Sequence, residues 1–136
     1  MAGTIRVGDI GKYAEGQFNK LITAAVLTAD QRLKLESPFD TGRFRASWAI
    51  GQNAAPFEGQ PEGDYPDNVP PNAVNYSLGN ESVGNVYSIH NNLIYAEPLA
   101  IKGSRKSGVP GGWVDRIAKD IQTYVNAEAD RIGRSS

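Results

Sequence analysis

The chain has 136 residues and a net charge of −1, with 40% hydrophobic and 21% charged residues. This length and composition indicate one soluble globular domain, and they exclude both a disordered chain and a second large core. The sequence contains no cysteine, which excludes disulfides and thiolate metal sites. No apolar run reaches the roughly 18 residues of a membrane helix or forms a secretion signal, so we expect no membrane contact and a cytoplasmic location.

The charges are unevenly distributed along the chain. Residues 1–51 carry seven Lys and Arg against five Asp and Glu, and residues 101–136 carry seven against four. Residues 52–100 carry six acids and no Lys or Arg. Two basic ends around an acidic middle indicate either an assembly with charge-complementary neighbours or simply a solvated acidic loop. No segment has the dense basic stripe of a nucleic-acid-binding protein.

Residues 9–36 have the apolar period of one long helix. The stripe consists of Ile10, Tyr13, Ala14, Phe18, Leu21, Ile22, Ala25, Ala29 and Leu33. Asp9 is placed to cap the start, and Pro38 ends the helix because proline disfavours helical geometry in the preceding residue. At 1.5 Å per residue the helix is about 40 Å long, so it overhangs a small core or packs on neighbouring subunits.

Residues 43–51 alternate between apolar and other side chains, which predicts a half-buried strand. Its apolar face is formed by Phe44, Ala46, Trp48 and Ile50. Residues 52–72 follow with five prolines and four acids, a composition that favours neither strand nor helix. A loop of this length inside one domain is usually functional or disordered.

Two more strands are predicted at residues 74–78 and 83–91, joined by a turn at Gly79-Asn80. Residues 102–112 form a glycine-rich basic loop, and residues 113–132 form an amphipathic helix that Gly133 ends.

The predicted fold class is therefore α+β, in a single domain covering residues 1–136. The β-sheet lies within residues 43–91. The long N-terminal helix and the C-terminal helix pack on one face of this small antiparallel sheet, and long loops complete the chain.

The triplet Asp40-Thr41-Gly42 matches an aspartic-protease half-site, but that chemistry needs two carboxylates and no second copy exists. We expect a structural turn, in which Asp40 accepts backbone amide hydrogens and Gly42 is left-handed. His90 is the only histidine, and no nucleophile elbow accompanies it. A hydrolase that uses Asp40 and His90 remains an alternative to this structural interpretation.

Other chemical motifs are also incomplete. Glu62, Asp64 and Asp67 do not have the spacing of an EF-hand loop, and residues 103–108 lack the Gly-Lys-Ser/Thr ending of a P-loop. We therefore predict no catalytic, cofactor or metal site. Trp48 and Trp113 serve either as core residues or as interface anchors.

Three segments resemble one known family. Ser37-Pro38-Phe39-Asp40-Thr41-Gly42-Arg43-Phe44-Arg45-Ala46-Ser47-Trp48 resembles the segment after the first helix in small tail-completion, neck and minor tail proteins of long-tailed bacteriophages. Asn91-Asn92-Leu93-Ile94-Tyr95-Ala96-Glu97-Pro98-Leu99 is similar to a second family segment, and residues 104–114 resemble the lead-in to its last helix. Ala100 and Lys102 depart from the family's usual glutamate and glycine, and the loops at 52–72 and 102–112 are longer.

The resemblance implies a structural virion subunit rather than an enzyme. Such a subunit forms a homo-oligomeric ring, commonly a hexamer, between the portal or connector of the head and the tail tube or its terminator. DNA passes through the ring without sequence-specific binding. The protein is expected in the host cytoplasm during assembly and then in the neck or tail of the virion. A tail terminator that caps the tube is the first alternative, and a monomeric binding module is another.

Three sets of residues are assigned to this function. The residues that hold the turn and strand after the first helix are Asp40, Thr41, Gly42, Arg43, Arg45 and Trp48. The residues expected to contact a subunit or partner are Lys102, Arg105, Lys106 and Trp113. The acids of the long loop, which face either the lumen of the ring or a basic neighbour, are Glu58, Glu62, Asp64 and Asp67.

Overall fold

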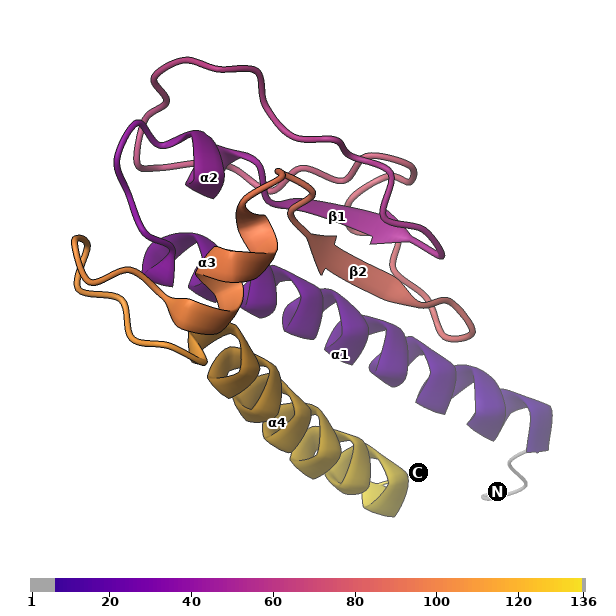
Figure 1. The fold of residues 1–136 in the computed structure, drawn as a ribbon. Helices are drawn as coiled ribbons and strands as arrows, with labels where there is room; N and C mark the ends of the chain where they lie inside the picture. The colour runs from indigo at the N-terminus through magenta and orange to yellow at the C-terminus, as the bar shows by residue number, and fades with distance from the viewer. Residues whose placement is uncertain (1–6, 136) are drawn as a thin grey trace.

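The computed structural model describes the backbone of residues 7–135 and the side chains of residues 15–134. The elements, in chain order, are α1 (Val7–Glu36), α2 (Arg43–Ala46), β1 (Ala49–Gln52), β2 (Tyr87–His90), α3 (Ala96–Lys102) and α4 (Trp113–Ser135) (Figure 1). The predicted α+β class is confirmed, because the two long helices pack with a small two-stranded antiparallel sheet. Within the described part of the chain, no helix is long and apolar enough to span a membrane.

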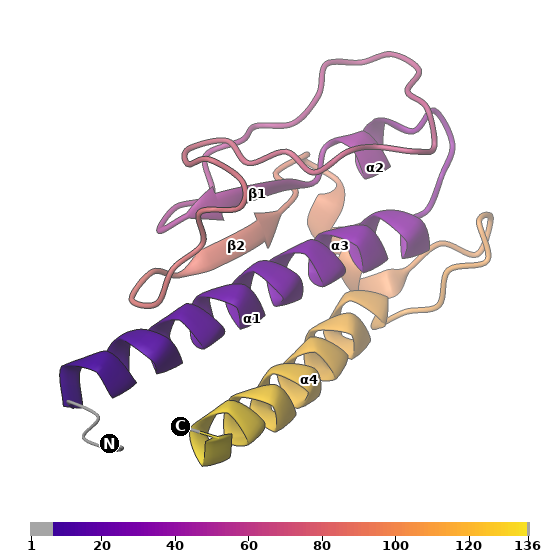
Figure 2. The ribbon, with the colours of Figure 1, turned by 180° about the vertical axis from the view of Figure 1, so that it is seen from behind.

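The two long helices run antiparallel, side by side, below the sheet (Figures 1 and 2). Arg32 joins them, because its guanidinium lies 2.7 Å from the carboxylate of Asp120 on α4 and 3.0 Å from that of Glu36 on α1. The 30 residues of α1 correspond to about 45 Å and the 23 of α4 to about 35 Å at 1.5 Å per residue. The long helix α1 therefore has a partner along most of its length.

The observed ends of the two long helices differ from two of the predictions. The helix α1 begins at Val7, so Asp9 lies inside it rather than at its N-cap. The helix α4 begins at Trp113 as predicted but continues through Gly133 to Ser135. Glycine in a helix costs only about 1 kcal/mol relative to alanine, and the ion pair between Asp130 and Arg134 (3.2 Å) spans this position.

The strand predicted at residues 43–51 is wrong in its first half. Arg43–Ala46 is a helical turn, and only Ala49–Gln52 forms a strand, paired with β2 so that Ala49 lies opposite His90. Ser47 and Ala49 alternate with the apolar residues and were expected to face outward, but both are fully buried. The alternation in the sequence therefore does not reflect a buried and an exposed face. Both sides of this segment are covered.

The strand predicted at residues 74–78 is also wrong, and the one at 83–91 shortens to Tyr87–His90. Residue 73 makes only an isolated bridge to Ile50. Beyond it the side chain of Asn75 replaces the ladder: its Oδ1 accepts the backbone N–H of Gln52 (2.7 Å) and its Nδ2 donates to the Gln52 carbonyl (2.8 Å).

The buried carboxylate of Glu81 fastens the following turn to α1. It accepts hydrogen bonds from Thr23 on α1, from the Tyr76 hydroxyl and from the Gly79 N–H. Burial alone would raise the pKa of Glu81, but these donors outweigh it and lower the pKa below its usual value. The pKa of Tyr76 is raised by its burial and by this hydrogen bond.

The short helix α3 was not predicted. Pro98 stands at its third residue, in the first turn, where a backbone N–H has no intrahelical partner to lose. Gly103, with a φ of 72°, follows the helix. Lys102, predicted to lie in the basic loop, is therefore the last residue of α3.

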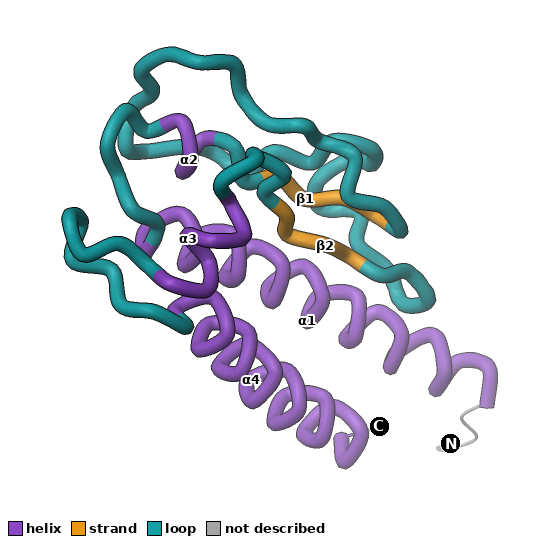
Figure 3. The backbone as a smooth tube through the Cα atoms, viewed as in Figure 1, coloured by secondary structure: helices purple, strands orange, loops and turns teal. Residues whose placement is uncertain are grey.

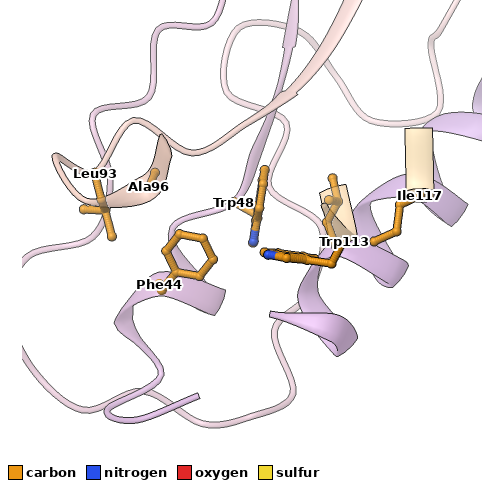
Figure 4. Packing of buried hydrophobic residues seen from close by; sticks show 7 residues of the cluster. Phe44, Trp48, Leu93, Ala96, Trp113 and Ile117 are labelled. Carbon is orange, nitrogen blue, oxygen red and sulfur yellow. The ribbon is translucent and has the colours of Figure 1, made fainter. Parts of the chain in front are cut away.

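An aromatic cluster holds the elements together (Figure 4). Trp48 packs edge-on against Trp113, with ring centroids 6.3 Å apart, and Phe44 packs against both. Each indole N–H is satisfied: Trp48 donates to the Ser37 hydroxyl (2.8 Å) and Trp113 to the Leu99 carbonyl (2.8 Å). The core interpretation of both tryptophans is confirmed.

A buried ion pair within α1 lies beneath the long loop. Lys34 Nζ is 2.8 Å from the Asp30 carboxylate, and the two side chains are 5% and 2% exposed. Lys34 also donates to the carbonyl oxygens of Val69 (3.4 Å) and Pro70 (2.9 Å). Burial raises the pKa of Asp30 and the Lys34 ammonium only partly offsets this effect, while Asp30 Oδ1 has no hydrogen-bond partner.

Lys34→Ala is expected to lower the free energy of unfolding by about 3–5 kcal/mol, because it leaves the Asp30 carboxylate buried without its cation. Arg32→Ala, which removes two partly exposed ion pairs, to Glu36 and to Asp120, should cost at most about 2 kcal/mol. Urea unfolding of both variants measures the difference. Equal losses would contradict the structural role of the buried pair.

Candidate functional site

Three irregular segments reach the end of the molecule where α1 ends and α4 begins (Figure 3). They are the post-helix turn (residues 37–42), the acidic strap (residues 53–72) and the basic hairpin (residues 104–109). All three contain residues that the sequence analysis assigned to function.

The two arginines of α2 fasten the strap through its backbone. Arg43 Nε donates to the Gln60 carbonyl (2.9 Å), and Arg45 donates to the Asp67 carbonyl (3.2 Å). Arg45 also donates to the Ser37 carbonyl (3.3 Å) and lies 4.9 Å above the Phe39 ring. Arg45 therefore holds the post-helix turn, as predicted, whereas the side-chain hydrogen bond of Arg43 goes to the strap. Both arginines fix the strap.

The post-helix turn depends on Gly42 more than on Asp40. Gly42 has a φ of 86°, and a Cβ there would lie 2.5 Å from the Tyr65 carbonyl oxygen of the strap. The Tyr65 N–H in turn donates to the Thr41 carbonyl (2.7 Å). Thr41 Oγ1, rather than the Asp40 carboxylate, accepts the N–H of Arg43 (3.3 Å). The predicted left-handed glycine is confirmed and the predicted capping role of Asp40 is wrong.

His90 fixes the start of the strap. Its Nε2 accepts the backbone N–H of Phe57 (3.1 Å), so Nδ1 carries the proton and faces the Ser88 carbonyl (3.2 Å). Asn92 donates to the carbonyls of Ala55 and Phe57. His90 is buried, and it lines none of the pockets that Asp40 lines. None of these three hollows around Asp40 reaches His90.

The acidic side chains of the strap point to solvent. All four are exposed, and none of them takes part in the ion pairs found among residues 15–134. They are Glu58, Glu62, Asp64 and Asp67. Because the strap's own backbone is tied to α1, α2 and β2, these carboxylates form a fixed acidic surface that no cation of the described chain neutralises in an ion pair.

The basic hairpin is short and well defined. Ser104 and Val109 exchange two backbone hydrogen bonds of 2.8 Å, and the Gly108 N–H donates to the Arg105 carbonyl (3.2 Å). Arg105 and Lys106 at its tip are exposed and, like the strap acids, belong to none of the described ion pairs. They remain available for contact. Trp113 is only 1% exposed, so its predicted contact role is wrong.

A groove of about 510 Å³ separates the basic hairpin from the post-helix turn. Leu35 and Phe39 line it and are 63% and 39% exposed. The cations Arg45, Lys106 and Arg116 line it together with Glu36 and Asp40. Glu36 is already paired with Arg32, so the groove combines apolar side chains with a basic excess.

Sequence reasoning missed the groove. Leu35 and Phe39 carried a signal, because both are apolar residues outside the stripe of the first helix. Arg116 carried no such signal, because the sequence indicated only that it lies on the polar face of the C-terminal helix.

Among the described side chains, no group of three or more His, Asp or Glu is placed to hold a metal ion. Comparison of the chain with protein-family models, with curated proteins and with solved structures found no match. The fold and the site together form an α+β domain with exposed, charged segments at one end.

Gly42→Ala should lower the free energy of unfolding by at least about 1–2 kcal/mol, because alanine is strained at this φ and its Cβ meets the strap backbone. Gly16→Ala is the matched control. It lies in α1 with open space around it, so it should raise stability by about 0.5–1 kcal/mol. Thermal unfolding of both variants tests the turn, and a neutral Gly42→Ala would contradict its assigned role.

Proposed function

We propose that the chain is a structural virion protein of a tailed bacteriophage, a tail-completion or neck protein that forms a ring at the head–tail joint. The ring contacts a connector or portal-side protein on one side and the tail tube or terminator on the other, and DNA passes through it. The protein acts in the host cytoplasm during assembly and in the neck of the mature virion. It has no catalytic role.

One observation carries the proposal. The three segments that resemble the phage family lie far apart in the sequence but supply most of one aromatic core. Phe44 and Trp48 come from the first segment, Tyr95 from the second and Trp113 from the third. Matches that arise by chance in separate loops would have no reason to pack on one another. The resemblance therefore covers a unit of structure.

The charged end of the molecule adds support. Its acidic strap and basic hairpin are both rigid and both lack intramolecular ion pairs among the described residues. Such surfaces suit a subunit with charged neighbours. A tail terminator would share these features and stays the alternative within the same class. A hydrolase is disfavoured, because Asp40 and His90 do not meet in one pocket.

A nonsense mutation early in the gene should produce filled heads beside complete but unattached tails, because the joint would lack its ring. Electron microscopy of the lysate is the measurement, and the wild-type gene supplied in trans is the control. Tails of uncontrolled length would favour the terminator alternative. Normal infectious particles would refute a required joining role.

Replacing Glu58, Glu62, Asp64 and Asp67 by lysine distinguishes two positions of the strap. A strap that faces the lumen repels DNA phosphates, so the variant should slow DNA ejection. A strap that faces a basic neighbour should lose joining altogether. Particle joining and DNA ejection rates are measured for this variant and for a control. The control is Glu15→Lys with Asp130→Lys, which changes charges at the other end of the long helices. Unchanged joining together with unchanged ejection would exclude both positions.

A further inference from the structure

We infer that the groove between the basic hairpin and the post-helix turn is the docking site for the acidic strap of a second copy of this chain. The inference rests on the proposed function for its setting, the ring, and adds which surface of one subunit meets which surface of the next. Its basis is the shape, charge and rigidity of the two surfaces.

The groove has the chemistry for an extended acidic segment. Its apolar side chains are accessible, because Leu35 is 63% and Phe39 39% exposed. Lys106 and Arg116 are exposed cations on its walls. Aromatic-lined grooves accept proline-rich extended peptides, and flanking cations select acidic ones.

The strap has the complementary chemistry. Its exposed carboxylates at Glu62 and Asp64 stand beside the exposed prolines Pro61 and Pro66. Its backbone is already bound within its own subunit, through Gln60, Tyr65 and Asp67. The side chains can therefore enter a neighbouring groove without any unfolding of the strap.

The strap cannot fill the groove of its own subunit. Its residues 62–64 lie on the other side of the post-helix turn, in a hollow with Asp40, Thr41 and Arg43. In Figure 1 the strap runs along the top of the molecule while the hairpin projects at the left. Two different surfaces in contact make a heterologous interface, which generates a ring when the rotation between copies closes.

Charge reversal in both surfaces tests this pairing. Lys106→Glu with Arg116→Glu gives an acidic groove, and Glu62→Lys with Asp64→Lys gives a basic strap. Each double variant should weaken self-association of the purified protein at least about tenfold in sedimentation velocity at low salt, because like charges then face each other. All four substitutions in one chain, or an equimolar mixture of the two double variants, should restore it.

Matched controls carry the same charge changes at the far end of the long helices. They are Lys20→Glu with Arg134→Glu, and Glu15→Lys with Asp130→Lys, and both should associate like the wild type. Circular dichroism and thermal unfolding check that every variant is folded.

The inference is overturned if the wild-type chain stays monomeric at high concentration and low salt, if both double variants associate like the wild type, or if the folded fourfold variant is no better than the double variants. The phage test separates this outcome from the proposed function. Double variants that assemble normally but fail to join heads to tails would refute the docking inference and leave the joining role intact. A wild-type chain that self-associates as inferred but is dispensable for joining would refute the proposed function and leave the docking inference intact.

Discussion

The contact between Trp48 and Trp113 is the constraint on which the rest of the structure depends. A two-stranded sheet of four residues per strand buries too little surface to be stable alone. The tryptophan contact joins the segment that follows α1 to the first residue of α4, and Phe44 and Tyr95 extend it to α2 and the start of α3. Because both indole N–H groups find acceptors, this large aromatic area is buried without an unsatisfied donor. The core thereby fixes the two loops that flank it, the post-helix turn and the basic hairpin.

The acidic strap shows how a chain without regular structure becomes rigid. Its prolines remove ladder donors, yet backbone groups near other elements still need partners. These partners are side chains: Lys34 from α1, Arg43 and Arg45 from α2, and His90 from β2. Basic and imidazole groups thus bind the strap's backbone and leave its carboxylates unpaired. The exposed carboxylates give the strap its surface charge, whereas the hydrogen bonds to its backbone give it its stability.

The sequence predicted the long helices because periodicity and Pro38 are local signals. It failed at residues 43–51, where burial on both sides made the apolar pattern compatible with a helical turn as well as a strand. It failed at residues 74–78, where the Asn75 side chain replaces the ladder, and it missed α3, a seven-residue helix with Pro98 in its first turn. The left-handed turn could be predicted from Gly42, whereas the groove could not be predicted. Leu35, Phe39 and Arg116 come together only through the packing of α1 on α4.

Rigidity at both surfaces bears on how a weak contact would serve the proposed ring. A strap and a hairpin that were mobile in the free subunit would lose conformational entropy on docking, at about 0.5–1.5 kcal/mol for each immobilised side chain. Here the backbones are ordered beforehand by internal hydrogen bonds, so only the tips of exposed side chains remain to be fixed. Each contact alone is then modest and sensitive to salt, as exposed charge pairs are. In a closed ring the last contact forms within one assembly, so its effective concentration is high and modest contacts suffice. In the proposed ring, closure would therefore supply stability that no single contact provides.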